Sequence, residues 1–289
     1  MATVGEWIEG ARLRTLPAAA APVLIGTGAA FDLDAGSIPR AVLAAGVALS
    51  LQVGVNYAND YSDGLRGTDD VRHGPQRLTG SGAASPRAVR AAAFAAFGVA
   101  AVLGLVLCAL AGTWWLLAVG ALCVVAAWFY TGGRRPYGYR GLGEIGVFIF
   151  FGLVAVLGTT YTQALAISWQ AVVGATGVGL IACALLMVNN IRDLPSDREA
   201  GKLTLAVRLG DRAARRAFVV LLVVPLVLVL PIARTHPAAL GVLVLAVPVW
   251  LVSRRVLGGA SRGDLISALR NTGLIELAYG LLLGAALAL

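Results

Sequence analysis

Stretches of about 20 apolar residues recur along the whole chain, and each is long enough to cross the hydrocarbon core of a bilayer as a helix. Of the 289 residues, 58% are hydrophobic and only 13% are charged, and the mean hydropathy is +0.82. A soluble domain carries about 25% charged residues, so this chain has too few polar side chains to cover a water-exposed surface. We therefore predict an all-α fold, a polytopic membrane protein whose helical bundle forms a single domain over residues 1–289.

Nine spans are expected, with the N-terminus in the cytoplasm and a break at Gly112-Thr113 inside the long apolar run from Leu103 to Tyr130. With this topology, only Arg40 and Arg234 of the 23 Lys and Arg residues fall in outer connections. Such an excess of basic residues on one side follows the positive-inside rule. The bilayer is thus the expected partner, and no basic soluble face is left to bind nucleic acid. The expected spans are 16–32, 40–58, 89–111, 113–130, 144–165, 168–189, 214–233, 238–257 and 268–289.

The inner end of the second span carries a cluster of Asn and Asp. If the helix continues to this point, Asn56, Asp60 and Asp63 lie at positions i, i+4 and i+7 and share one narrow stripe. A single acid at the end of a span is ordinarily a helix cap or the partner of a nearby arginine. Acidic residues are energetically costly in or beside a membrane. A cluster of them that occurs twice therefore indicates a functional site and not only helix caps.

The sixth span ends on a matching stripe of Asn189, Asp193 and Asp197, although Pro195 is expected to break the helix before Asp197. Two inner helix ends, one in each half of the chain, therefore present the same residue types. Carboxylate and amide oxygens without His or Cys suit a hard cation such as Mg²⁺. Magnesium commonly completes its coordination shell with phosphate oxygens, so the paired clusters predict a site for a phosphate compound.

Basic residues follow the fourth and sixth spans. Arg134 and Arg135 come shortly after Tyr130, and Lys202, the only lysine of the chain, follows the second cluster. One reading is that they are positive-inside markers alone. Cations beside a bound metal are also what a diphosphate requires as its negative charge develops. A diphosphate held at the cytoplasmic rim would let a long hydrocarbon tail run between the spans.

The patterns Asn59-Asp60-x-x-Asp63 and Asn189-x-x-x-Asp193-x-x-x-Asp197 resemble the paired Asp-rich motifs of the UbiA superfamily of intramembrane prenyltransferases. Segments 59–69, 74–82 and 201–210 are most similar to its members of menaquinone synthesis. The resemblance implies Mg²⁺ as cofactor, polyprenyl diphosphate and 1,4-dihydroxy-2-naphthoate as substrates, and loss of diphosphate and CO₂. It also implies a bacterial cell membrane, with the N-terminus and the active-site loops in the cytoplasm.

The resemblance further implies roles for individual residues. Metal binding is expected of Asn56, Asp60, Asp63, Asn189, Asp193 and Asp197. Diphosphate binding is expected of Tyr130, Arg134, Arg135 and Lys202. The expected catalytic residues are Asp60, Asp63, Asp193, Asp197 and Lys202.

Two positions depart from the family pattern. The usual last Asp of the first motif is Gly67, for which we expect Asp69 to substitute, and the usual first Asp of the second motif is Asn189. Asn59 and Arg66 are further candidates, and either Arg77 or Arg72 is expected to receive the carboxylate of the acceptor.

Two alternatives remain at this point. The acceptor of a prenyltransferase of this kind could instead be another aromatic acid, such as 4-hydroxybenzoate or homogentisate. A secondary transporter would also show paired halves and intramembrane acids. Transporters bind near the midplane of the bilayer, however, whereas these acids lie at helix ends among Arg and Lys. Prenyl transfer is therefore the favoured hypothesis.

Overall fold

A computed structural model describes residues 2–67 and 77–289, and every regular element in this part of the chain is helical. The prediction of an all-α membrane bundle is confirmed. Four further helical segments connect or extend the α-helices: the 3₁₀-helices η1 (Leu13–Thr15), η2 (Tyr137–Arg140) and η4 (Pro237–Leu245), and the π-helix η3 (Phe148–Val154). The helices are α1 (Val4–Gly10), α2 (Pro17–Asp32), α3 (Ile38–Leu65), α4 (Pro86–Ala111), α5 (Leu116–Thr131), α6 (Gly143–Val147), α7 (Ala155–Ala164), α8 (Trp169–Glu199), α9 (Leu205–Leu209), α10 (Asp211–Ile232), α11 (Ala246–Leu257) and α12 (Arg262–Ala288).

Seven helical stretches within the described residues are long and apolar enough to cross a membrane. Two of them include a helix of another type, since the π-helix η3 joins α6 to α7 and the 3₁₀-helix η4 leads into α11. The helices α2 and α5 have only 16 residues each, so the count of nine spans stays a prediction. The expected break at Gly112 is confirmed: α4 ends at Ala111, and Gly112 adopts a left-handed φ of 71° that closes the helix.

One prediction about helix ends is wrong. Pro195 does not break the helix, because α8 continues through it to Glu199. A proline removes one backbone hydrogen bond, but α8 packs along α10 and α12 for much of its length, and the Ser196 hydroxyl donates to the Asp193 carbonyl oxygen at 2.9 Å. Tertiary packing thus outweighs the local penalty, and Asp197 stays on the same helix as Asn189 and Asp193.

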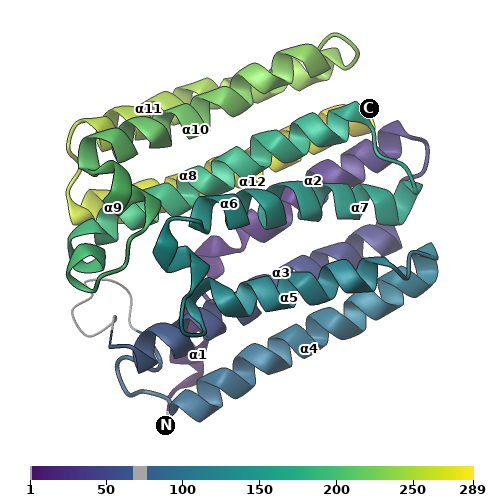
Figure 1. Ribbon diagram of the computed structural model, residues 1–289. Coiled ribbons are helices and arrows are strands. Elements are labelled where there is room, and N and C mark those ends of the chain that lie inside the picture. Colours follow the sequence, from purple (N-terminus) through teal and green to yellow (C-terminus); the bar gives the residue numbers. More distant parts are fainter. Residues whose placement is uncertain (1, 68–76) are drawn as a thin grey trace.

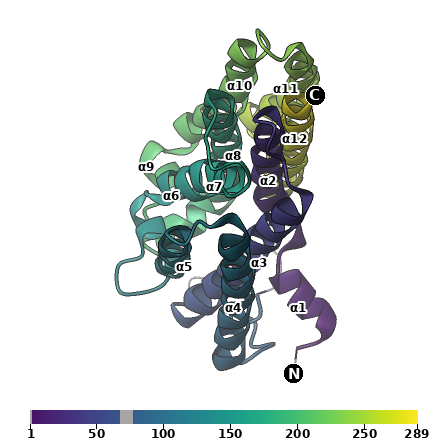
Figure 2. The same cartoon turned by 90° about the vertical axis from the view of Figure 1, so that its right-hand side faces the viewer.

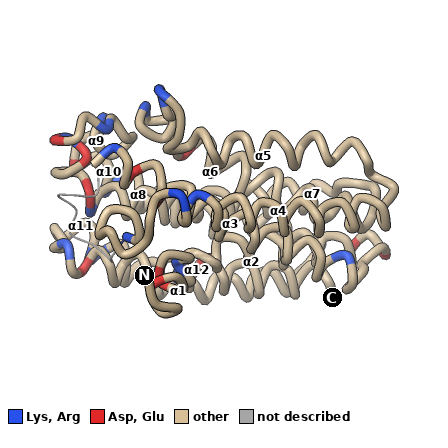
Figure 3. Tube along the Cα trace, turned by 90° about the horizontal axis from the view of Figure 1, so that it is seen from below, with Lys and Arg blue, Asp and Glu red and all other residues tan. Residues whose placement is uncertain are grey.

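The helices lie side by side along a common direction, with α10 and α11 at one edge of the bundle and α4 at the other (Figures 1 and 2). The largest buried apolar cluster joins α2, α8, α10 and α12, and a smaller one joins α1, α3 and α4. Lys, Arg, Asp and Glu gather toward the end of the bundle that holds α9, and few lie at the opposite end (Figure 3). The fold therefore has one charge-rich end, at which α3 and α8 terminate.

Close approach of α2 and α12 depends on glycine. A Cβ built on Gly28 would overlap the backbone of Gly284, and one on Gly280 would lie 2.7 Å from the Cα of Ala21. Small residues at such crossings let two helix backbones touch, which is how helices associate within a membrane.

We expect Gly28→Ala to lower stability by about 1 to 3 kcal/mol, because the added methyl group forces the two backbones apart. The matched control is Gly98→Ala in α4, where a Cβ would meet nothing within 4 Å. That change should leave stability unchanged or raise it by up to about 1 kcal/mol. Thermal unfolding of the purified proteins in detergent measures both, and equal midpoints for the two variants would contradict the role assigned to Gly28.

Candidate active site

One flank of the inner end of α3 holds the neighbouring segments in place. The Asn56 side chain donates to the Ala11 carbonyl oxygen at 2.9 Å. The buried Asp60 carboxylate accepts the backbone N–H groups of Leu78 and Thr79, at 2.9 and 2.8 Å. Both side chains thus fix the position of chain segments that reach α3 from elsewhere in the sequence, and metal binding by Asn56 and Asp60 stays a prediction.

The other flank of the same helix end contacts a different part of the protein. The Asn59 side-chain oxygen accepts a hydrogen bond from the Thr131 hydroxyl at 2.8 Å. Four residues further on, the Asp63 carboxylate accepts the hydroxyl of Tyr139 at 2.6 Å. Since residues four apart lie on one face of a helix, Asn59 and Asp63 together face the connection between α5 and α6.

On α8, the second motif is organised by an arginine. The Arg192 guanidinium donates from Nε to Oδ1 and from Nη2 to Oδ2 of Asp193, each at 2.7 Å. Its Nη2 also donates to the Asn189 side-chain oxygen at 2.8 Å. The Arg192 side chain is only 4% exposed. A buried, two-pronged contact of this kind compensates the charge of Asp193 and fixes the direction of its carboxylate.

The last acid of the second motif is joined to the lysine that follows it. After α8 the chain reverses at Gly201, whose φ is 69°, and the Lys202 N–H donates to the Asp197 carbonyl oxygen at 2.8 Å. The Lys202 ammonium then lies 3.8 Å from the Asp197 carboxylate, with 21% of its side chain exposed. The turn therefore returns the only lysine to the motif, as the predicted diphosphate site requires.

Tyr139 lies where these parts meet. The Lys202 ammonium is 4.8 Å from the centroid of its ring, and the Cζ atom of Arg66 is 5.3 Å from the same centroid. Its carbonyl oxygen accepts the Leu203 N–H at 3.0 Å, and its hydroxyl donates to Asp63. Tyr139 thereby connects the first motif with the segment after the second one. Sequence reasoning missed this residue, because nothing in its spacing distinguishes it from an ordinary interfacial tyrosine.

The other predicted diphosphate ligands, and the further candidate Arg66, lie at the end of α5 or in the connection after α3 and α5. Arg66 donates to the carbonyl oxygens of Thr131 and Gly133. Tyr130 packs edge-on against the ring of Tyr137, with 5.4 Å between centroids. The predicted ligands Arg134 and Arg135 are exposed on the turn after α5.

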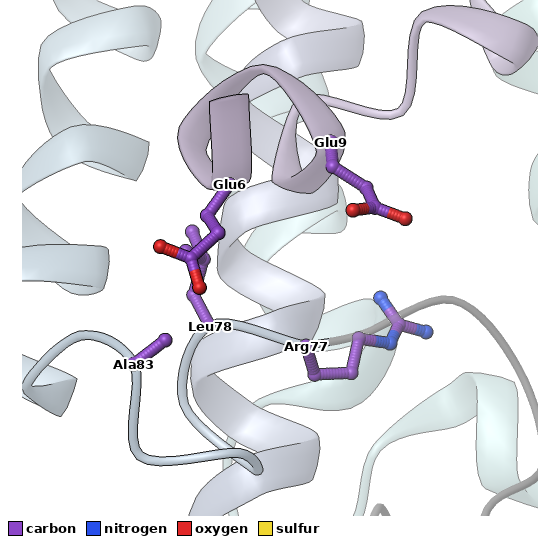
Figure 4. A pocket seen from close by; sticks show the side chains of 5 residues that line it. All are labelled: Glu6, Glu9, Arg77, Leu78 and Ala83. Atoms are coloured by element: carbon purple, nitrogen blue, oxygen red, sulfur yellow. The ribbon is translucent and has the colours of Figure 1, made fainter. Parts of the chain in front are cut away.

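The candidate Arg77 lies apart from this region, and other candidates fall outside the described residues. Arg77 lies beside α1, in a shallow hollow that is also lined by Glu6, Glu9 and Leu78, and its side chain extends on the side of Glu9 (Figure 4). Binding of an acceptor carboxylate by Arg77 stays a prediction. Asp69 and Arg72 lie outside the described residues.

The donor chemistry fits magnesium. The side chains that the two motifs direct toward this end are carboxylates and amides, all oxygen donors. Among the described residues, no group of three or more His, Cys, Asp or Glu side chains is arranged to hold a metal by itself. Magnesium is typically bound through one or two carboxylates together with substrate phosphates, and not by an all-protein cage. The residues present are therefore suited to an ion that arrives with a diphosphate.

Comparison with known proteins places this geometry in a family. Residues 15–269 match the model of the UbiA prenyltransferase family. The 1,4-dihydroxy-2-naphthoate octaprenyltransferase of Mycobacterium tuberculosis is 50% identical over 100% of this chain and 98% of its own length. The enzyme of the same name from Escherichia coli is 41% identical, over 76% of this chain and 74% of its own length.

Solved structures share the fold. A UbiA homolog from Aeropyrum pernix in its apo form superposes with a TM-score of 0.70 at 18% identity, covering 93% of this chain and 96% of that one. A UbiA homolog from Archaeoglobus fulgidus bound to DMAPP and Mg²⁺ gives a TM-score of 0.68 at 14% identity, covering 97% and 99%.

The contacts of Asp60 predict a local effect of its replacement. We expect Asp60→Asn to raise the rate of tryptic cleavage after Arg77 about tenfold or more, because a carboxylate holding two N–H groups is replaced by an amide that can accept only through its oxygen. Limited proteolysis in detergent measures the rate. Asp63→Asn is the matched control, since it makes the same change three residues away, where the partner is a tyrosine hydroxyl. Equal cleavage of the two variants would show that Asp60 does not hold this segment.

Proposed function

Since this chain belongs to the UbiA prenyltransferase family, we propose that it transfers a polyprenyl chain from polyprenyl diphosphate to 1,4-dihydroxy-2-naphthoate. Diphosphate and CO₂ are released, and the product is the reduced form, a demethylmenaquinol, because the transfer leaves both ring hydroxyls in place. Support for the acceptor comes from the relatives in Mycobacterium tuberculosis and Escherichia coli, both of which are named for this reaction.

The observation that carries the proposal is the meeting of oppositely charged groups at the charge-rich end of the bundle. Asp63 comes from α3 and Arg66 directly follows that helix, while Asp197 and Lys202 come from the end of α8 and the turn after it. Tyr139 contacts three of these residues: its hydroxyl donates to Asp63, and its ring lies beside Arg66 and Lys202. Asp197 forms an ion pair with Lys202. Oxygen donors beside fixed cations provide both halves of a metal–diphosphate site.

Magnesium, when bound, would supply positive charge that stabilises the departing diphosphate. Asp63, Asp193 and Asp197 are the residues we expect to hold it, with the amide oxygens of Asn59 and Asn189 nearby in sequence and on the same helix ends. A UbiA homolog of the same fold has been solved with DMAPP and Mg²⁺, which supports this donor and this ion.

The side chains of the protein contribute in three ways. Lys202 and Arg66 bind the diphosphate oxygens and stabilise the negative charge that develops as the C–O bond breaks. The allylic carbocation that forms is attacked by the electron-rich ring of the naphthoate, which then loses its carboxylate as CO₂. Apolar and aromatic walls keep water from the cation: Trp128 of α5 stacks on Tyr61 of α3, with centroids 5.9 Å apart, and lies 5.0 Å from Phe94 of α4.

The protein is a multi-pass membrane protein, and we propose that it lies in a bacterial cell membrane with its charge-rich end in the cytoplasm. The distribution of Lys and Arg supports this orientation, since they gather at the end of the bundle that holds α9 (Figure 3). The long apolar helices then leave room for the prenyl tail in or beside the bilayer.

Reconstituted protein with a polyprenyl diphosphate, 1,4-dihydroxy-2-naphthoate and Mg²⁺ should form a demethylmenaquinol, and EDTA should abolish the product. We expect Asp63→Asn and Asp193→Asn to lower kcat about a hundredfold or more, because each removes a charge opposite the metal. The control is Asp211→Asn, an acid at the start of α10 whose partner is Arg215, one turn further along the same helix. Its activity should stay near that of the unaltered protein.

The acceptor assay separates the alternatives. Prenylation of 4-hydroxybenzoate or homogentisate without reaction of the naphthoate would retain prenyl transfer and overturn the acceptor. Absence of product with every aromatic acid would overturn prenyl transfer itself.

Orientation is tested by cysteine labelling. A cysteine introduced at Ser261, before α12 at the charge-rich end, should react with a membrane-impermeant maleimide only in inverted vesicles. A cysteine at Gly36, between α2 and α3, should react only in intact cells or right-side-out vesicles. The opposite pattern would place the active site outside the cell.

A further inference from the structure

Tyr139 has two separable contacts, one through its hydroxyl and one through its ring. The hydroxyl donates to Asp63 at 2.6 Å, a length typical of a hydrogen bond to a charged oxygen. The ring lies beside two cations, Arg66 and Lys202, at 5.3 and 4.8 Å. Its backbone is tied to the segment after α8 through Leu203. No other aromatic ring in the described residues has two cations in such contact.

We propose that Tyr139 is a positioning residue for the metal–diphosphate site, which sets the direction of Asp63 through its hydroxyl and the spacing of Arg66 and Lys202 through its ring. The inference rests on the proposed function and deepens it. Tyr139 lies outside both Asp-rich motifs. In this role it aligns Asp63 of the first motif with Lys202, the cation that follows the second motif.

The hydroxyl acts on the metal side of the site. A carboxylate that accepts one hydrogen bond from a fixed donor loses freedom of rotation, and its remaining lone pairs point in defined directions. Partners of this kind behind a metal ligand commonly change metal affinity by about 10- to 100-fold when removed. The donor is itself fixed, because η2 is pinned to the segment after α8 by the Leu203 hydrogen bond and Gly141 packs against the Arg208 side chain.

The ring acts on the diphosphate side. Two like charges repel, and the negative face of an aromatic ring attracts each of them. The ring therefore keeps Arg66 and Lys202 near one another at a defined separation before any anion is bound. A diphosphate entering this region meets cations that need little rearrangement, which is the condition for strong electrostatic stabilisation.

Two substitutions of Tyr139, tested with a ligand that does not react, separate the role of the hydroxyl from that of the ring. Tyr139→Phe removes the hydroxyl and keeps the ring, whereas Tyr139→Leu removes both. The probes are Mg²⁺ and farnesyl thiolodiphosphate, an analogue whose C–S bond resists cleavage. Isothermal titration calorimetry of the full-length protein in detergent gives the affinity for each, and thermal unfolding verifies that the variants are folded.

For Tyr139→Phe we expect the affinity for Mg²⁺, in the presence of the analogue, to fall about tenfold or more. Its affinity for the analogue at saturating Mg²⁺ should stay within about twofold, because the cation–ring contacts persist. Tyr139→Leu should weaken both affinities. The matched control is Tyr161→Phe in α7, which likewise removes a phenol oxygen. The ring of Tyr161 packs edge-on against Trp115. Its affinities should equal those of the unaltered protein.

Unchanged Mg²⁺ affinity in Tyr139→Phe would overturn the role of the hydroxyl, and unchanged analogue affinity in a folded Tyr139→Leu would overturn that of the ring. A merely structural role would lower the unfolding temperature without separating the two affinities. No acceptor is present in these titrations. The affinities for Mg²⁺ and for the analogue can therefore be compared even if 1,4-dihydroxy-2-naphthoate is not the substrate. Absence of binding to the unaltered protein would overturn both this inference and prenyl transfer.

Discussion

Carboxylates buried at the end of a membrane bundle must each find a donor or a cation, and this requirement organises the charge-rich end of the protein. An ionised acid in a poorly hydrated interior is costly unless it is paired and hydrogen-bonded. Each of the four motif acids is partnered by a different type of group: two backbone N–H groups for Asp60, a phenol for Asp63, a guanidinium for Asp193 and an ammonium for Asp197. The partners come from separate segments, so satisfying the acids also brings those segments together.

Local sequence patterns were sufficient for the features that depend on one helix at a time. The apolar runs predicted an all-α membrane bundle, and Gly112 predicted the break between α4 and α5. Pro195 shows the limit of this reasoning. Its local preference predicted a helix end, but α8 is packed along other helices and continues past it. Propensity is a weak guide where tertiary contacts hold both sides of a position.

Contacts between residues far apart in the sequence could not be predicted from the spacing of residues along one helix. Tyr139 reaches Asp63 only because the α5–α6 connection folds back over the end of α3, and Lys202 reaches Asp197 only because the chain reverses at Gly201. The contact of Glu144 was missed for the same reason: it lies in the first turn of α6, yet it is buried and accepts a hydrogen bond from Asn190, 46 residues away. Such contacts join residues that no periodic pattern relates.

The geometry of α3 explains how one short motif can serve both architecture and chemistry. Successive residues of a helix are turned by about 100°, so Asp60 and Asp63 lie on neighbouring flanks of the same helix end. The flank with Asn56 and Asp60 binds the segments at 11 and 78–79, and the flank with Asn59 and Asp63 meets the α5–α6 connection. Because the helix between them is rigid, anchoring the first flank also fixes the second. A ligand that must be held within fractions of an ångström benefits from such support, so we infer that the anchoring residues of the motif contribute to the chemistry without having to touch the substrate.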